Sequence, residues 1–277
     1  MSTSREVLLP YGVLDGKLVS VDEVRDGLAC SCTCPACHQA LIARQGTRKV
    51  HHFAHASGTT CPHAAQTAAH ILAKGILAQE LHMVVPTAYP MKTTTRFVAF
   101  PEHDVAFTSV VLEQRLSSIV PDVVATVEDG TQLIVEIRVK HAVDDGKLDK
   151  ICGLGISAIE VAIDAADFYD TDRLRQHLLG SPSGKHWLYS SAAEQERQRL
   201  FGTAQKIPIV CHGYAIHTAW CPMCEREYRG ESYANVVDDC IGCDYLLTIG
   251  DDNGTIEGEV WCLAPRPHED REKTLFP

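Results

Sequence analysis

The chain has 277 residues, of which 45% are hydrophobic and 22% charged, a composition typical of a globular protein large enough for more than one domain. Its formal net charge of −11 argues against a protein that coats nucleic acid by bulk electrostatic attraction. The sequence has neither an apolar run near the roughly 20 residues of a membrane helix nor an apolar secretory signal, so we expect a soluble, cytoplasmic protein without a membrane partner.

Three segments follow one another along the chain. Residues 1–62 begin with short alternating strands around Asp15-Gly16, a hairpin signal, and continue into a cluster of cysteines and histidines. Residues 63–180 alternate helical and strand patterns. Residues 181–277 start in a Gly/Ser/Pro-rich linker, pass through a charged helical stretch and end in a second cysteine cluster. We therefore expect an N-terminal Cys/His module, an α/β core and a C-terminal cysteine-rich part.

The N-terminal cluster has the spacing of a zinc site. Thiols stay reduced in the cytosol, so clustered Cys and His indicate metal ligands before disulfides. Cys34-Pro-Ala-Cys37 supplies one pair, and we expect His52 and His55 to supply the other, with Phe53 in a small core. His51 is an alternative to His52. Three further residues could substitute as ligands: Cys32, Cys61 and His63.

The same region is free of acidic residues. No Asp or Glu occurs between Gly27 and Gln79, although the average acid content of the chain would place about seven there. The basic residues Arg44, Arg48 and Lys49 remain in this window. This pattern predicts a surface that faces phosphates. The alternative is a metal knuckle that excludes competing carboxylates.

Residues 121–140, PDVVATVEDGTQLIVEIRVK, have the pattern of a β-hairpin with an unusual charged face. A turn at 128–131 pairs strands 123–127 and 132–140, and alternation places Glu136, Arg138 and Lys140 on one face. The hairpin folds Asp122 back beside Glu136. Two carboxylates so placed repel each other unless a cation lies between them, which predicts a site for Mg²⁺ or Mn²⁺. The alternative is an edge hairpin with a solvated charged face.

A helix over 144–154 and a short strand over 156–163 follow the hairpin, a pattern that indicates an α/β fold with a mixed sheet. The strand carries Glu160. We interpret it either as an accessory of the hairpin site or as a buried acid paired with Lys147 or Lys150.

The C-terminal cluster carries the most specific motif. Cys221-Pro-Met-Cys224 is followed after fifteen residues by Cys240-Ile-Gly-Cys243. Two such pairs can complete a tetrahedral four-thiolate site, which leaves no open coordination position and is therefore structural. We predict a zinc ribbon here, and hence about two zinc ions per chain. Cys211 and Cys262 would be spare or core thiols.

Two resemblances connect these features. Pro121-Asp122, followed after thirteen residues by Glu136-x-Arg138, resembles the signature of PD-(D/E)xK nucleases, with arginine at the lysine position. The order of the wider features, over roughly 30–165 and 211–248, resembles the CoiA-like family, named for a competence protein. Those features are Cys34-Pro-Ala-Cys37, His52-Phe-Ala-His55, Ala69-His70…Lys74, the 121–136 core, His141…Asp145…Lys147, Ile159-Glu160-Val161 and the C-terminal zinc ribbon.

The resemblance implies a restriction-endonuclease-like core in which Asp122 and Glu136 hold the divalent metal, Arg138 or Lys140 is the catalytic cation, and DNA is the substrate. Arginine is almost never deprotonated, so Arg138 can stabilise charge but cannot act as a general base. The helix expected over 62–82 also lacks the acid that many such enzymes place there. His70 and Lys74 on that helix could contact phosphate instead, or could be ordinary surface residues.

Further accessory residues are Lys147, Glu160 and His141, of which His141 could bind the scissile phosphate or only cap the next helix. We therefore predict a metal-dependent DNA nuclease whose zinc modules position the nucleic acid. RNA remains a possible substrate. The alternative is a catalytically inactive adaptor that binds nucleic acid or a protein partner.

Overall fold

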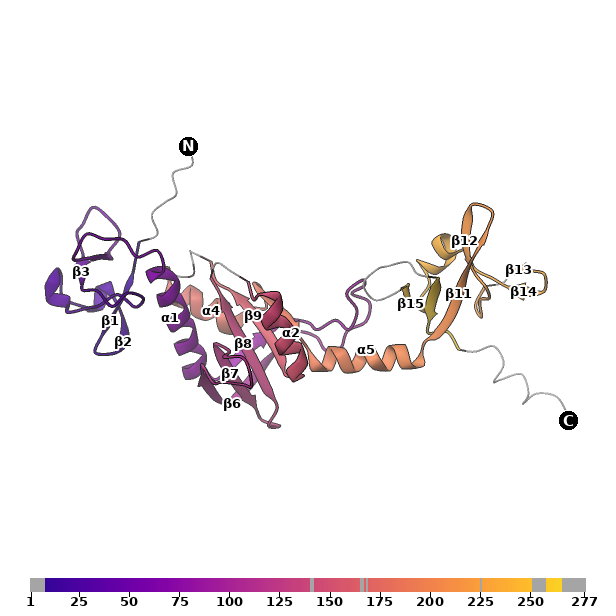
Figure 1. Ribbon diagram of the computed structural model, residues 1–277, viewed down its shortest axis with the longest axis horizontal. Helices are drawn as coiled ribbons and strands as arrows, with labels where there is room; N and C mark the ends of the chain where they lie inside the picture. The colour runs from indigo at the N-terminus through magenta and orange to yellow at the C-terminus, as the bar shows by residue number, and fades with distance from the viewer. Residues whose placement is uncertain are drawn as a thin grey trace. The chain divides into compact units, whose positions relative to one another are not determined.

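The computed structural model describes residues 8–139, 142–164, 167, 169–224, 226–250 and 258–265. These residues fall into two compact units. The first lies within Met1–Pro86 and Glu102–Ser190, and the second within Thr87–Pro101 and Ser191–Pro277 (Figure 1). No helix in the described part of the chain is both long and apolar enough to span a bilayer.

The first unit is built on a six-stranded sheet with the order β10-β9-β8-β7-β6-β5. Every neighbouring pair is antiparallel except β8 and β9, which are parallel and joined through α2, so the predicted mixed sheet is confirmed. The strands are β5 (His82–Val85), β6 (His103–Leu112), β7 (Val123–Val127), β8 (Gln132–Arg138), β9 (Ser157–Ala162) and β10 (Lys185–Tyr189).

Helices cover the sheet and its edges curl toward each other. α2 (Asp145–Leu154) packs Ile151 against Ile134 of the sheet, while α1 (Ala64–Glu80) and α4 (Thr171–Gly180) flank the sheet on the other side (Figure 1). Lys185 Nζ donates to the Val84 carbonyl at 2.7 Å, and the Trp187 indole donates to Pro86 at 3.0 Å. The edge strands β10 and β5 are therefore tied together by side chains.

The N-terminal module contains two small hairpins. β1 (Tyr11–Leu14) and β2 (Lys17–Ser20) are joined at Asp15 and Gly16, whose φ angles of 48° and 78° are those of a tight hairpin turn, as predicted. β3 (Leu41–Arg44) pairs with β4 (His52–His55). Two short 3₁₀ helices, η1 (Val21–Glu23) and η2 (Leu28–Cys30), complete the module. Its core contains Leu9, Tyr11, Val21, Leu41, Phe53 and the alanine face of α1.

The second unit consists of α5 (Ser191–Thr203), a four-stranded sheet and a small hairpin. The sheet order is β12 (Ala215–Thr218), β11 (Gln205–His212), β16 (Glu259–Cys262), β15 (Leu246–Ile249). The hairpin pairs β13 (Glu227–Tyr228) with β14 (Glu231–Ser232), and η3 (Val236–Cys240) is a single π-helical turn.

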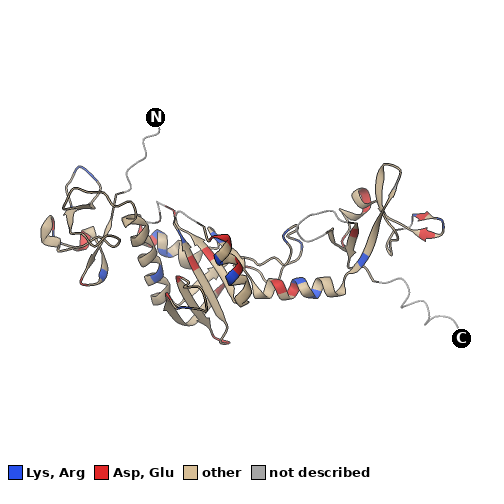
Figure 2. Ribbon diagram, in the orientation of Figure 1, with Lys and Arg blue, Asp and Glu red and all other residues tan. Residues whose placement is uncertain are grey.

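The segment 87–101, although it interrupts the first unit in sequence, packs with the second. Met91 lies in a buried cluster with Leu200 of α5 and Leu247 of β15. Acidic and basic residues are interleaved along α5 (Figure 2). There Arg197 pairs with Glu194, and Arg199 with Glu196, one turn apart.

Candidate functional site

Asp122 and Glu136 lie side by side in the first unit. β7 and β8 pair with Val123 opposite Val135, so Asp122, just before β7, is the neighbour of Glu136. The backbone N–H of Ile137 donates to Asp122 Oδ2 at 2.9 Å. The hairpin thus brings together the two carboxylates that the sequence pattern singles out. The alternative of an edge hairpin with a solvated charged face is wrong, because the face that carries Glu136 is buried.

Glu136 is a buried carboxylate held by a lysine. It is 4% exposed, and Lys147 Nζ of α2 lies 2.7 Å from its Oε1. Burial raises the pKa of the Glu136 carboxyl and the nearby charge of Asp122 adds to the rise, while the hydrogen bond and charge of Lys147 oppose it. A buried acid with a raised pKa beside a second acid is the arrangement that a cation relieves.

Asp122 faces α1. His70 Nδ1 lies 3.5 Å from Asp122 Oδ2, and Lys74 Nζ lies 3.6 Å from Oδ1. Burial alone would raise the pKa of Asp122, but hydrogen bonds from His70 and the Ile137 amide, together with the charge of Lys74, lower it overall. Lys74 is 8% exposed and also lies 2.6 Å from Glu113, a partner that sequence patterns did not indicate. These two α1 residues therefore do not form an ordinary solvated surface.

Glu160 is 1% exposed, so it is a buried acid. Arg138 Nε lies 2.9 Å and His186 Nε2 3.3 Å from its Oε1, and the Val143 N–H donates to its Oε2 at 2.7 Å. The carboxylate thus holds β8, β10 and the segment before α2 together.

The alternative interpretation, in which Glu160 pairs with Lys147 or Lys150, does not hold, because its ion-pair partners are Arg138 and His186. Glu136 and Glu160 are direct neighbours in the parallel pair β8–β9. Lys147 reaches the first of these acids, and Arg138, two residues along β8, reaches the second. Lys140 and His141, the other expected site residues on this segment, lie outside the described residues.

A Cys/His cluster in the N-terminal module can hold a metal ion. The ligand atoms of Cys34, Cys37, His55 and Cys61 all lie within 4.8 Å of one another, and three thiols with one imidazole are a common zinc ligand set. Burial raises the pKa of Cys34 to about 11, whereas a hydrogen bond from the Gln39 backbone lowers the pKa of Cys37. A bound cation would hold both as thiolates.

Cys61 takes the place in this group that the sequence analysis gave to His52. Side chains three residues apart on a strand point to opposite faces, and both histidines lie on β4. Phe53 and His55 share one face, with Phe53 buried as expected, while His52 Nδ1 contacts the Val50 carbonyl at 2.8 Å. The alternative ligand His51 instead pairs with Asp22.

Two of the other possible ligands also lie elsewhere. Cys32 is a core residue at 1% exposure, next to Cys30. His63 is exposed and precedes the first turn of α1. Cys61 is the one of these alternatives that joins the ligand group. Its position is fixed by the start of α1, because the Ala64 N–H donates to the Cys61 carbonyl.

Five thiols meet in the second unit. Cys221, Cys224, Cys240, Cys243 and Cys262 line a cavity of about 150 Å³. Burial raises the pKa of Cys240 to about 12, and the neighbouring thiols add to the rise. In the described residues the N-terminal group is the only one whose ligand atoms all lie within 4.8 Å, so zinc in this second cavity stays a prediction. Cys262 joins the group from β16, and Cys211 is exposed.

Arg96 clamps the second cysteine pair. Its guanidinium donates to the carbonyls of Cys243 at 2.7 Å, Asp244 at 3.1 Å and Leu246 at 3.0 Å. A residue of the 87–101 segment thereby supplies hydrogen-bond donors to the backbone carbonyls of the turn after Cys243, within the same unit. Sequence spacing offers no signal for this contact.

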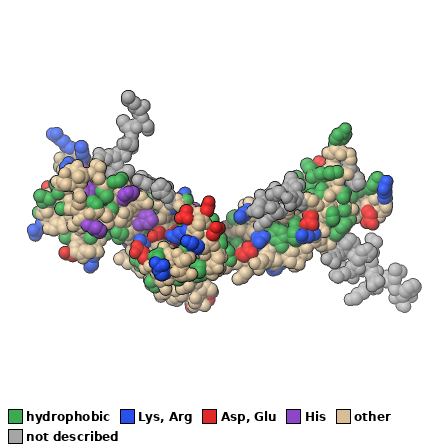
Figure 3. Space-filling view, viewed as in Figure 1, with side chains coloured by type: hydrophobic (Ala, Val, Ile, Leu, Met, Phe, Trp, Pro, Cys, Tyr) green, Lys and Arg blue, Asp and Glu red, His purple; other side chains and the backbone are tan. Residues whose placement is uncertain are grey.

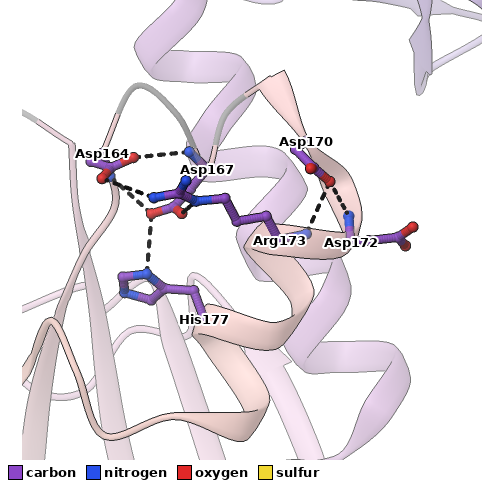
Figure 4. A network of polar contacts seen from close by, with 6 residues as sticks. All are labelled: Asp164, Asp167, Asp170, Asp172, Arg173 and His177. Carbon is purple, nitrogen blue, oxygen red and sulfur yellow. Dashed lines mark hydrogen bonds and ion pairs between the residues drawn. The ribbon is translucent and has the colours of Figure 1, made fainter.

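A further charged network lies next to the end of β9 (Figure 4). Asp167 is 1% exposed and accepts from Arg173 Nε at 2.9 Å, with His177 Nδ1 at 3.1 Å. Asp164 and Asp167 exchange backbone-to-carboxylate hydrogen bonds of 2.9 and 3.2 Å. The network fixes the start of α4 against the sheet.

Of the residues expected to face phosphate, Arg44 and Lys49 line a cavity of about 750 Å³ in the first unit. Arg48 is exposed and is not part of that wall.

The fold and site together define an α/β protein with an N-terminal Cys/His cluster that can hold a metal ion and, in its sheet, a half-buried Asp122 beside a buried Glu136. Residues 20–64 match the family described as Competence protein CoiA, N-terminal domain. This match confirms the CoiA-like resemblance, and it spans all four residues of the Cys/His cluster. Neither the curated proteins nor the solved structures contain a match to this chain.

Proposed function

We propose that this chain is a metal-dependent nuclease of the PD-(D/E)xK type that hydrolyses phosphodiester bonds of DNA. The observation that carries the proposal is the placement of Asp122 opposite Glu136 at the ends of β7 and β8, with Lys147 2.7 Å from Glu136. The arrangement α1, then the antiparallel strands β6, β7 and β8, then α2 and a parallel β9 also agrees with such a core.

The donor set fits a hard divalent cation. Asp122 and Glu136 would hold Mg²⁺ or Mn²⁺, because each offers carboxylate oxygens and their charges repel in a partly buried site. When bound, the ion would neutralise developing charge on a phosphate and lower the pKa of a water molecule.

Lys147 is the cation best placed to act with Glu136. The signature position is held by Arg138, but that guanidinium is engaged by Glu160, 2.9 Å away. Lys147 reaches Glu136 from α2 and carries a primary amine, as the missing lysine would. His70 and Lys74, which face Asp122 from α1, supply positive charge on the other side of the acidic pair.

The two cysteine-rich sites would position these elements. Zinc held by Cys34, Cys37, His55 and Cys61 would connect the end of β4 to the residues just before α1. Because α1 carries His70 and Lys74, a metal-fixed N-terminus of the helix also fixes their distance from Asp122. Zinc bound by the four cysteines of the predicted C-terminal ribbon would stabilise the second unit in the same way.

An inactive adaptor is the second candidate, and one observation favours it. Lys147 pairs with Glu136, while Lys74 and His70 pair with Asp122, so the acidic pair is already compensated by side chains. An adaptor would bind nucleic acid or protein without turnover.

Cleavage of fluorescent DNA with Mg²⁺ or Mn²⁺ tests the proposal. We expect Asp122→Asn, Glu136→Gln and Lys147→Met each to lower the rate by about 100-fold or more. Lys150→Met, on an exposed position of the same helix, is the matched control and should cleave as the wild type does. Binding without any cleavage would support the adaptor, and unimpaired cleavage by Asp122→Asn and Glu136→Gln would refute the proposed site.

A further inference from the structure

The 750 Å³ cavity of the first unit lies between the N-terminal module and the end of the sheet. β4 and the loop before α1 form one wall, the first turns of α1 the second, and Val139 and Ile163, which follow β8 and β9, the third. Histidine side chains gather over this part of the molecule (Figure 3). The cavity is as large as many ligand-binding sites.

The wall is positively charged and its cations are available. Arg44 and Lys49 both line the cavity, both are exposed, and neither makes an ion pair with any described residue. The acid on the wall, Asp164, lies 3.6 Å from Arg173, which it shares with Asp167, so the two cations of the wall outnumber its one acid. Ala64, the first residue of α1, also borders the cavity, and the first turn of that helix contains no acid. The positive end of the helix dipole adds to the field of the two cations.

The cavity adjoins the candidate catalytic site on two sides. Gln66 of its wall lies one helical turn before His70, which faces Asp122. Val139 of its wall lies three residues after Glu136 along the β8 segment. A chain bound in the cavity would therefore lead along α1 and β8 toward the acidic pair.

The size of the cavity selects among nucleic acids. A volume of 750 Å³ is that of a site for a drug-sized ligand, which can enclose a short unpaired segment but not both strands of a duplex. A single strand can enter such a space with its phosphates on the cations. His52, half-buried on the wall, supplies a ring of the kind that stacks on unpaired bases.

We propose that this cavity binds an unpaired segment of nucleic acid through Arg44, Lys49 and His52, and that it gives the site a preference for single strands over duplexes. The inference rests on the proposed nuclease function for its link to cleavage, but the binding itself does not depend on turnover.

The test separates binding from cleavage by using the full chain with Glu136→Gln. Fluorescence anisotropy with a labelled 12-nucleotide DNA, as a single strand and as a duplex, should give at least about tenfold tighter binding of the single strand. Removing two phosphate contacts with Arg44→Ala/Lys49→Ala should reduce the slope of log K against log salt by about 1.4. The control Lys17→Ala/Arg25→Ala removes the same charge from exposed positions in the same module and should keep the slope.

The outcomes distinguish the two proposals. Equal or tighter binding of the duplex, or the same salt slope for both double variants, would overturn the cavity proposal even if the wild type cleaves DNA. Single-strand binding that depends on Arg44 and Lys49, with no cleavage by the wild type, would uphold the cavity and refute the nuclease. The same oligonucleotide as RNA identifies which sugar the cavity accepts, and zinc content of each variant confirms that the module is intact.

Discussion

The two units differ in what they bury. The buried charged residues described, Lys74, Glu136, Glu160, Asp167 and Lys185, all belong to the first unit. The buried polar side chains described in the second unit are neutral: Gln205, Thr218 and Thr248. Burying a charge is unfavourable unless partners compensate it, so charges accumulate where a structure has chemistry to perform. This difference agrees with our proposal of a catalytic site in the first unit, whereas the second unit has a framework of thiols and neutral hydrogen bonds.

The thiols show the same contrast. Cys34, Cys37 and Cys61 of the first unit form a compact ligand group with His55, at the edge of the module and next to α1. Five of the six thiols of the second unit line the wall of an apolar cavity, beside Ile207 and Val260 of its core. We expect the first group to connect a module to a helix and the second to support a core.

The largest effect should follow from breaking the N-terminal metal group. Structural zinc contributes on the order of 10 kcal/mol to the folding of small modules, so Cys34→Ser or Cys61→Ser should remove about one zinc ion per chain and expose the N-terminal module to proteolysis. Elemental analysis and limited proteolysis measure both changes.

His52→Ala is the matched control for that experiment, because His52 lies on the opposite face of β4 from His55. It should keep its zinc. Zinc loss from His52→Ala with retention in Cys61→Ser would mean that the ligand set is wrong.

The second largest effect should come from the network around Asp167. Asp167→Asn removes the buried charge that faces Arg173 and His177, and loss of its charge-assisted hydrogen bonds to these two partners should cost about 3 kcal/mol. Urea unfolding measures the change. Asp164→Asn, exposed and 3.6 Å from Arg173, should cost less than about 1 kcal/mol. Equal losses in the two variants would show that burial does not set the strength of this network.

In the second unit, the next effect concerns the hydrogen bonds of Arg96. Arg96→Ala leaves the carbonyls of Cys243, Asp244 and Leu246 without this donor, and we expect a loss of roughly 1–3 kcal/mol in the unfolding of that unit. Thermal unfolding with and without a zinc chelator measures it. Lys92→Ala, exposed on the same segment, should leave stability unchanged, and a comparable loss there would assign the effect to the segment's charge instead.

Local patterns were enough to predict the hairpin of β7 and β8, because alternation and the Asp-Gly turn specify both its register and the neighbours Asp122 and Glu136. The same rule, applied to β4, would have excluded His52 as a partner of His55. The prediction that His52 and His55 bind one ion rested on their spacing alone.

Other features depend on contacts that spacing does not encode. The loop before α1 returns Cys61 to Cys37, 24 residues earlier in the sequence, and such a return has no local signal. Glu160 takes partners from β8 and β10 because of strand order, which the sequence leaves open. The packing of 87–101 with the second unit is likewise a property of the assembled core.

The last predicted effect grows with pH and tests whether buried charge makes the first unit sensitive to pH. Burial lowers the pKa of Lys185 from 10.5 to about 7, and the charge of Asp104 opposes this only in part. Between these two values the unfolded chain holds a proton that the folded chain has lost, so the stability cost of Lys185 is full below about 7 and fades as pH rises. Wild-type stability should therefore rise relative to Lys185→Met by at most about 1.4 kcal/mol per pH unit.

Urea unfolding from pH 6 to pH 9.5 measures this difference, and groups common to both proteins cancel in it. Lys206→Met in the second unit is the matched control, since Lys206 is 54% exposed above the ring of Trp261. Its difference from the wild type should stay constant with pH. A parallel course for Lys185→Met would mean that Lys185 keeps its proton in the folded chain, because hydration or the carbonyl of Val84 compensates for its burial. The contrast between a charged and a neutral unit would then have to rest on the carboxylates alone.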